Sequence, residues 1–206
     1  KIRGLNPLRG GTYTIIPYQI EAGTYLAAVA ATGGNVLVQN VIPKHLDCIT
    51  GKLQDMGVKI IPFDDAVRVI SDRRLRPATA KTRPYPGFPT DMQAQVCVCM
   101  ALAHGISRLT ESVYETRFFG YCSELESMGA KISIEGRTAI VTGVDHLKGA
   151  TVAAHDLRAG AALVIAGLMA RGVTEIYEPE YIDRGYEHLE DKLCSLGAEI
   201  RREKFE

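Results

Sequence analysis

The sequence lacks tryptophan, a net charge and any long apolar run. Its 24 basic and 24 acidic side chains balance, and lysine and arginine form no cluster. The electrostatic basis for binding nucleic acid or an anionic membrane surface is therefore missing. The longest apolar run, from Ala22 to Ala31, is interrupted by Gly23 and Thr24 and is far shorter than the roughly 20 residues that span a bilayer. We expect no nucleic-acid partner and no membrane partner.

The sequence also lacks the residue patterns that hold metals and disulfides. Cys97 and Cys99 lie close together in an apolar run, but no second cysteine or histidine pair follows at the spacing of a zinc site. A P-loop, a dinucleotide-binding glycine motif, a zinc-protease motif and a nucleophile elbow are missing as well. An odd number of scattered cysteines is typical of free thiols in a reducing cytoplasm; they are Cys48, Cys97, Cys99, Cys122 and Cys194. We expect a cytoplasmic protein without a metal site.

One motif occurs three times. The eight-residue segments LQDMGVKI, LESMGAKI and LCSLGAEI begin at Leu53, Leu125 and Leu193, so 72 and 68 residues separate successive copies. In each copy a glycine follows a helical pattern and precedes a strand pattern, which is a common way for a helix to end. The chain therefore contains three copies of one unit.

The residues before each motif repeat in the same order. Each copy has an opening extended segment, an apolar alanine-rich helix, a short strand and a more polar helix. The opening segments are Leu8–Thr12, Leu75–Thr79 and Leu147–Thr151; the apolar helices are expected at Ile20–Ala31, Asp91–Ala103 and Asp156–Ala170; the strands are expected at Asn35–Val41, Ile106–Val113 and Val173–Glu178. Chance likeness between ordinary α/β segments is the alternative, but several markers in one order argue against it.

A single unit of this size exposes apolar faces that it cannot bury alone. We predict one α/β domain over residues 1–206, built of three pseudo-threefold-related repeats at about 8–74, 75–146 and 147–206, with the alanine-rich helices at its centre. Ile2–Gly10 parallels Val141–Gly149, which indicates that the chain begins in the closing strand of an earlier unit. We expect upstream residues, and a strand from them that completes the third unit.

Two arginines occur where helices are expected to begin. Arg158 follows Asp156 at the start of the third buried helix, and Arg184 follows Asp183 at the expected start of a later helix. The aspartates are typical N-caps, whereas an arginine in the first turn opposes the helix dipole, which favours anions there. The two guanidinium groups therefore indicate a site for phosphate or carboxylate. The alternative is that both arginine side chains end in water.

Asp91 lies at the expected start of the second buried helix, near the position that Arg158 holds in the third unit. A carboxylate that faces the same opening as two arginines can accept a proton from a hydroxyl group. N-capping of the helix, shared with Thr90, is the alternative. The preceding Pro84–Pro89 segment is a stiff, extended approach, because proline fixes its own φ and restricts the residue before it.

Three motifs resemble the UDP-N-acetylglucosamine 1-carboxyvinyltransferase family, and the resemblance covers the whole chain. They are PYPGFPTDMQAQ at Pro84–Gln95, HDLRAGAA at His155–Ala162 and IDRGYE at Ile182–Glu187. The resemblance implies a two-domain protein in which each domain is an inside-out α/β barrel of the enolpyruvyl transferase type. This chain would be the C-terminal lobe, with the active site in the cleft toward a missing N-terminal lobe.

The resemblance also implies an activity. The full-length protein would transfer the enolpyruvyl group of phosphoenolpyruvate to the 3-hydroxyl of UDP-N-acetylglucosamine, the first committed step of peptidoglycan synthesis, without a metal or organic cofactor. Asp91 would contact that hydroxyl and act as its base, and Arg158 and Arg184 would hold the anionic groups. Arg117 would join them, and Val113 would touch the UDP-sugar.

The other lobe of this family carries the catalytic cysteine loop, so the resemblance implies that the fragment is inactive alone. The sequence departs from the family where Tyr18-Gln19 replaces the usual Asp-Arg or Asp-Gln pair. A non-catalytic paralogue or an interaction module with the same fold is the alternative function. A relative that acts on a shikimate substrate is a further alternative.

Overall fold

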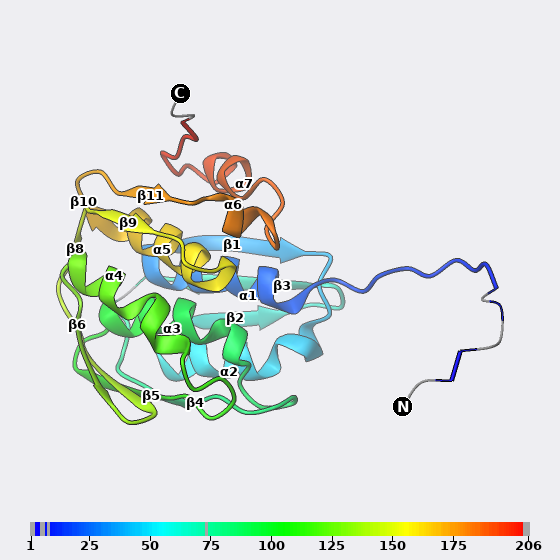
Figure 1. The fold of residues 1–206 in the computed structure, drawn as a ribbon, viewed down its shortest axis with the longest axis horizontal. Helices are drawn as coiled ribbons and strands as arrows, with labels where there is room; N and C mark the ends of the chain where they lie inside the picture. Colours follow the sequence, from blue (N-terminus) through cyan, green and yellow to red (C-terminus); the bar gives the residue numbers. More distant parts are fainter. Residues whose placement is uncertain (1–2, 5–6, 8, 73, 204–206) are drawn as a thin grey trace.

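The computed structural model describes residues 3–4, 7, 9–72 and 74–203, and it places helices at the centre with sheets around them (Figure 1). Three central helices contact one another in every pairing; they are α1 (Gln19–Thr32), α3 (Gln93–Ala101) and α5 (Leu157–Met169). Small side chains such as Ala27, Ala101 and Ala162 have no exposed surface at these contacts, so the helices approach closely. The observed bounds agree with the expected apolar helices to within two residues.

The first unit forms an antiparallel sheet that packs on α1. Its strand order is β1-β3-β2, and the side chains of Val67 and Val69 on the middle strand are buried. The unit comprises β1 (Gly34–Gln39), the 3-10 helix η1 (Pro43–Leu46), α2 (Asp47–Asp55), β2 (Lys59–Pro62) and β3 (Ala66–Ser71).

The second unit repeats this sheet and adds one strand. The order β5-β7-β6 is antiparallel like β1-β3-β2. Strand β4, which precedes α3 in the chain, pairs in parallel with β5, which follows α3. The unit comprises β4 (Thr79–Lys81), the 3-10 helix η2 (Thr90–Met92), β5 (Ile106–Thr110), the 3-10 helix η3 (Arg117–Gly120), α4 (Cys122–Ser127), β6 (Lys131–Glu135) and β7 (Thr138–Thr142).

The third unit contains only the parallel part of this pattern. Strand β8 pairs with β10 and β9 pairs with β11, both in parallel, as β4 pairs with β5. The elements are β8 (Leu147–Lys148), β9 (Thr151–Ala153), β10 (Ala170–Arg171), β11 (Glu175–Tyr177), α6 (Glu180–Asp183) and α7 (Leu189–Ser195). The described residues after α7 form no strand.

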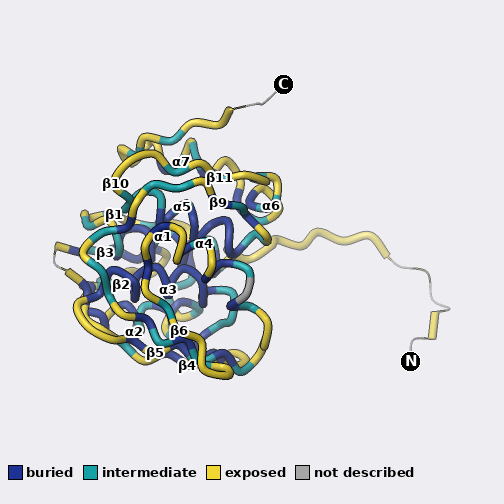
Figure 2. Tube along the Cα trace, turned by 60° about the vertical axis from the view of Figure 1, so that its left-hand side comes forward, coloured by how far each residue is buried: buried dark blue, intermediate teal, exposed yellow. Residues whose placement is uncertain are grey.

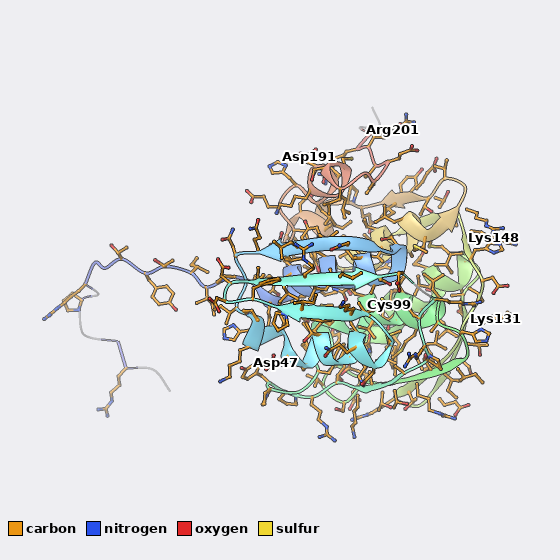
Figure 3. All side chains as sticks on the ribbon, turned by 180° about the vertical axis from the view of Figure 1, so that it is seen from behind. Asp47, Cys99, Lys131, Lys148, Asp191 and Arg201 are labelled. Carbon is orange, nitrogen blue, oxygen red and sulfur yellow. The ribbon has the colours of Figure 1, made fainter. Side chains whose placement is uncertain are left out.

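Buried residues concentrate in α1, α3 and α5, whereas the outer loops and the extended segment before α1 are exposed (Figure 2). Cys99 of α3 lies inside the fold, while the charged residues Asp47, Lys131 and Lys148 lie at its periphery (Figure 3). The helices of the described part are all too short or too polar to cross a membrane. Helices inside and sheets outside confirm the predicted inside-out α/β architecture.

Gly160 tests how tightly the third helix is packed. A Cβ atom at this position would lie 2.5 Å from Ile182 Cγ1 and 2.9 Å from Ala154 Cβ. We expect Gly160→Ala to lower the free energy of unfolding by about 1–3 kcal/mol, the usual effect of overpacking a core. Urea denaturation followed by circular dichroism measures this change.

Gly51→Ala is the matched control, because Gly51 lies inside α2 and a Cβ there would meet no atom within 4 Å. This control should raise the free energy of unfolding by up to about 1 kcal/mol through helix propensity alone. Equal effects of the two substitutions would show that α5 is not close-packed at Gly160.

Candidate functional site

One carboxylate is held by two arginines where the central helices begin. Asp91 lies in η2 directly before α3, and Arg158 lies in the first turn of α5. Arg158 Nη2 donates to Asp91 Oδ2 at 2.9 Å, and Arg117 Nη2 donates to Asp91 Oδ1 at 3.0 Å. Because each guanidinium takes a different oxygen, the plane of the carboxylate is fixed. The structure therefore brings Asp91, Arg158 and Arg117 together, whereas the sequence had led us to expect Arg184 as the second main cation of this cluster.

Arg158 is buried between two tyrosine rings. Its guanidinium carbon lies 5.3 Å from the ring centre of Tyr18 and 5.8 Å from that of Tyr186, within the range of cation–π attraction. Both hydroxyl groups accept hydrogen bonds from Arg158, that of Tyr186 at 3.4 Å. Burial alone would lower the pKa of Arg158, but the interactions with Tyr186 and Asp91 raise it above the ordinary value. A permanent positive charge thus stands beside Asp91.

A buried network of polar side chains holds the Tyr186 hydroxyl group in place. The Thr24 hydroxyl donates to Ile20 O at 2.8 Å, so it accepts from Tyr186 OH at 3.0 Å and from Gln95 Nε2 at 3.1 Å. This assignment leaves the Tyr186 oxygen as the acceptor for Arg158 Nη1. The network joins α1, α3 and the segment after α6, and thereby fixes the ring against which Arg158 rests.

Asp156 caps the helix that carries Arg158. Its Oδ1 accepts from the backbone N–H groups of Arg158 at 2.7 Å and Ala159 at 2.8 Å. The N-cap interpretation of Asp156 is therefore confirmed. Asp91, in contrast, caps no helix, since its carboxylate bonds the two arginines instead.

The expected position of Arg184 in a helical first turn was wrong. Asp183 is the last residue of α6, Arg184 is the residue that follows it, and α7 begins only at Leu189. Helix α6 begins after Pro179 and is only four residues long. The Asp183 carboxylate caps no helix; it accepts hydrogen bonds from Arg202 at 2.7 and 2.8 Å. A cation after a helix C-terminus is favoured by the dipole, so the anion argument does not apply to this residue.

Arg184 nevertheless belongs to the segment beside Arg158. A Cβ atom on the adjacent Gly185 would lie 3.7 Å from Arg158 Nη1. The Arg184 side chain is exposed and makes no hydrogen bond or ion pair within the described residues. It does not contact Asp91 here, and it remains available to a ligand.

An open cleft of about 300 Å³ adjoins this cluster. Its walls come from the start of α1, the Pro84–Pro89 loop and the turn after β5, and they include Tyr18, Arg83, Asp91 and Val113. The Nε atoms of Arg117 and Arg158 are buried without a partner in the described part of the chain. The cleft is thus lined by the Asp91 carboxylate, which Arg117 and Arg158 hold, while the two uncommitted Nε donors are buried.

Glu111 bonds two residues that line the cleft, Thr90 and Val113, and it was not identified from the sequence. This fully buried carboxylate follows β5 and accepts hydrogen bonds from Thr82 at 2.5 Å, Thr90 at 2.8 Å and Gln93 at 3.0 Å. It also accepts from the backbone N–H groups of Val113 and Tyr114 at 2.6 and 2.9 Å. A carboxylate inside the expected strand Ile106–Val113 was the only signal in the sequence, because most of its partners lie 18 to 29 residues away.

Residues 1–193 match the family of EPSP synthase (3-phosphoshikimate 1-carboxyvinyltransferase). Together with the inside-out fold and the cleft at the helix ends, this match defines an enolpyruvyl transferase-type chain. The chain belongs to this family.

The curated relatives are more specific. UDP-N-acetylglucosamine 1-carboxyvinyltransferase 3 of Caldanaerobacter subterraneus subsp. tengcongensis is 56% identical over 202 residues, which are 98% of this chain and 48% of that protein. The UDP-N-acetylglucosamine 1-carboxyvinyltransferase of Clostridium botulinum is 54% identical over 202 residues, which are again 98% of this chain and 48% of that protein. The chain spans about half the length of the curated relatives it matches.

Solved structures agree on the fold. The enolpyruvyl transferase NikO from Streptomyces tendae superposes with a TM-score of 0.82 at 29% identity, covering 92% of this chain and 45% of that one. An EPSP synthase from Acinetobacter baumannii superposes with a TM-score of 0.72, covering 94% and 46%. At 20% identity the second likeness concerns the fold alone.

Glu111 gives the stability of the fold a defined pH dependence. Burial alone would raise its pKa, but the hydrogen bonds from Thr82, Tyr114, Val113 and Thr90 lower it below the ordinary value of 4.5. A carboxyl whose pKa is depressed on folding stabilises the native state above its ordinary pKa, and this contribution is lost as the pH falls through the depressed value. We expect Glu111→Gln to melt well below the wild type at pH 7.

That difference should begin to shrink as the pH falls below about 4.5, where the carboxyl of the unfolded chain is protonated, and it should be lost as the pH falls through the depressed pKa of the folded protein. Below that value the wild-type carboxyl is neutral, as the amide is at every pH. Thermal melts of both proteins from pH 7 to pH 3 measure it. A difference that stays constant over this range would contradict an ionised Glu111 in the folded state.

Proposed function

We propose that the protein carrying this chain transfers the enolpyruvyl group of phosphoenolpyruvate to the 3-hydroxyl of UDP-N-acetylglucosamine. The observation that carries the proposal is Asp91 held between Arg117 and Arg158 at the edge of a cleft. The 56% identity to a UDP-N-acetylglucosamine 1-carboxyvinyltransferase supports this substrate over a shikimate derivative.

The chemistry requires a base, a cluster of cations and a source of one proton. In the proposed reaction the sugar 3-oxygen bonds to C2 of phosphoenolpyruvate while C3 gains a proton, which gives a tetrahedral intermediate. Loss of phosphate from C2 and of a proton from C3 then yields the enolpyruvyl ether. Asp91 is the proposed acceptor of the hydroxyl proton, since a positioned carboxylate is an effective general base.

The arginines are the proposed partners of the anionic groups. Phosphoenolpyruvate carries a carboxylate and a phosphate, and guanidinium groups bind both through paired N–H donors. Arg158 and Arg117 stand beside Asp91, and Arg184, which makes no hydrogen bond or ion pair to a described residue, is free to turn toward the same anion. On this proposal the incoming anion neutralises part of the positive charge of the arginines, which Asp91 alone neutralises in this structure.

Val113 is the proposed backbone contact to the UDP-sugar. Its side chain is 45% exposed, it lines the cleft, and its N–H group is already bound to Glu111. A backbone contact from this residue to the sugar would therefore use its carbonyl oxygen.

The rest of the site is proposed to come from a second lobe. The chain covers 48% of its curated relatives, and the cleft, which Tyr18 and Asp91 help to line, is open. That lobe would supply the proton donor for C3 and close over the substrates, and this chain alone would not turn over. We place the activity in the cytoplasm, at the first committed step of peptidoglycan synthesis, and hence in cell-wall biogenesis, cell shape and division.

Asp91→Asn tests the proposed base. The amide cannot accept the hydroxyl proton, so kcat should fall by about 10²–10⁴-fold, the usual contribution of a general base. Phosphate release by the full-length protein with both substrates measures the rate. Asp145→Asn is the matched control, because Asp145 is an exposed aspartate that pairs with Arg74 at the surface; it should leave kcat unchanged. Equal rates of the two variants would remove Asp91 from the mechanism.

Arg184→Ala tests the proposed anion contact. Loss of a charge-assisted hydrogen bond that forms only with the ligand should reduce kcat/KM for phosphoenolpyruvate by about 10- to 100-fold, equivalent to roughly 1.5–3 kcal/mol. The melting temperature should stay near that of the wild type, since Arg184 has no partner in the described part of the fold. Arg201→Ala, at another exposed arginine, is the control. A kcat/KM that matches this control would show that Arg184 does not bind the substrate.

A further inference from the structure

Glu111 connects two segments that both line the cleft, the turn after β5 and the 3-10 helix η2. Its Oε1 atom accepts from the N–H groups of Val113 and Tyr114, and its Oε2 atom accepts from the Thr90 hydroxyl and the Gln93 amide. One side of the carboxylate therefore holds the turn after β5, and the other side holds η2 with Asp91.

The contacts continue from Glu111 to a closed ring. Thr90 is adjacent to Asp91, Asp91 pairs with Arg117, and the Arg117 guanidinium lies 5.1 Å from the ring centre of Tyr114. Tyr114 returns to Glu111 through its backbone N–H group. A displacement of any member of this ring would move Asp91 relative to Val113.

The buried charge has no cation partner among the described residues. An ionised carboxylate without a counterion is costly in a protein interior unless hydrogen bonds replace its hydration. Here five donors do so. A neutral core residue of the same size would need none of them, which indicates that the carboxylate serves to hold these donors in place.

On the basis of the proposed function, we propose that Glu111 is a positioning residue that sets the distance between the base Asp91 and the UDP-sugar contact at Val113. It touches neither substrate. Its Oε2 contacts orient the proton acceptor, and its Oε1 contacts orient the backbone that faces the sugar.

Thr90→Val distinguishes a positioning role of Glu111 from a contribution to the stability of the fold alone. Thr90 makes one side-chain hydrogen bond, to Glu111 at 2.8 Å, and Thr110 on β5 makes one of the same kind, to Thr138 at 2.9 Å. In the full-length protein, Thr90→Val should lower kcat by about 10- to 100-fold, since small misplacements of a catalytic group cost this much. Its KM for the UDP-sugar should stay within about twofold of the wild type, because the Val113 turn keeps its contacts.

Thr110→Val is the matched control, with a similar fall in melting temperature and an unchanged kcat. Thr90→Ser, which keeps the hydroxyl, should restore the rate. A Thr90→Val enzyme as active as Thr110→Val, or a Thr90→Ser enzyme as slow as Thr90→Val, would overturn the proposal.

Glu111→Gln gives a readout that does not depend on turnover. The amide can offer its oxygen to only one of the two turns, so amide hydrogen exchange in the Gly105–Gly120 or Arg83–Gln93 region should speed up by about tenfold or more relative to Thr110→Val. Unchanged exchange in both regions would show that Glu111 holds neither turn. If the wild-type protein transfers no enolpyruvyl group, the proposed function fails, while this exchange measurement still decides whether Glu111 fixes the turns.

Discussion

The shared ion pair of Asp91 with Arg117 and Arg158 is the interaction on which the site depends. Its three members come from three different segments, so it forms only when η2, η3 and α5 are packed against one another as they are here. Two tyrosine rings and a buried hydroxyl network hold Arg158 in turn. The carboxylate is thereby oriented before any ligand arrives, which is the preorganisation that an electrostatic site requires.

The small residues of the central helices make this convergence possible. Close contact among α1, α3 and α5 brings the starts of α3 and α5 near enough for the Arg158 side chain to bond the Asp91 carboxylate. The sheets lie outside these helices (Figure 1) and leave the helix starts open to the cleft. The internal threefold repetition thus accounts for both the core and the location of the site.

Much of the fold and part of the site could be predicted from the sequence. The repeated glycine motif and the alanine-rich helices indicated the architecture, because local periodicity encodes helix and strand directly. Arg158 was singled out because an arginine in the first turn of a helix opposes the helix dipole, and Asp91 because it lies near the equivalent position of the second unit; the structure shows these two side chains in contact. Arg184 was placed in the wrong helical position, since the sequence pattern does not show that α6 ends after four residues.

The supporting contacts were out of reach for a different reason. Glu111, Tyr186 and Gln95 make their bonds to residues that are distant in the chain, and no local pattern marks a buried polar network. Tyr18 was noticed only as a departure from a family pattern, whereas the structure shows its ring against Arg158.

A structure of the full-length protein with bound UDP-N-acetylglucosamine tests the central claim most directly. The account predicts that the sugar 3-oxygen lies about 2.6–3.2 Å from a carboxylate oxygen of Asp91, the distance needed for proton transfer, while Arg158 keeps its place between the two tyrosine rings. A sugar whose 3-oxygen faces another group, with Asp91 still closed against both arginines, would contradict it.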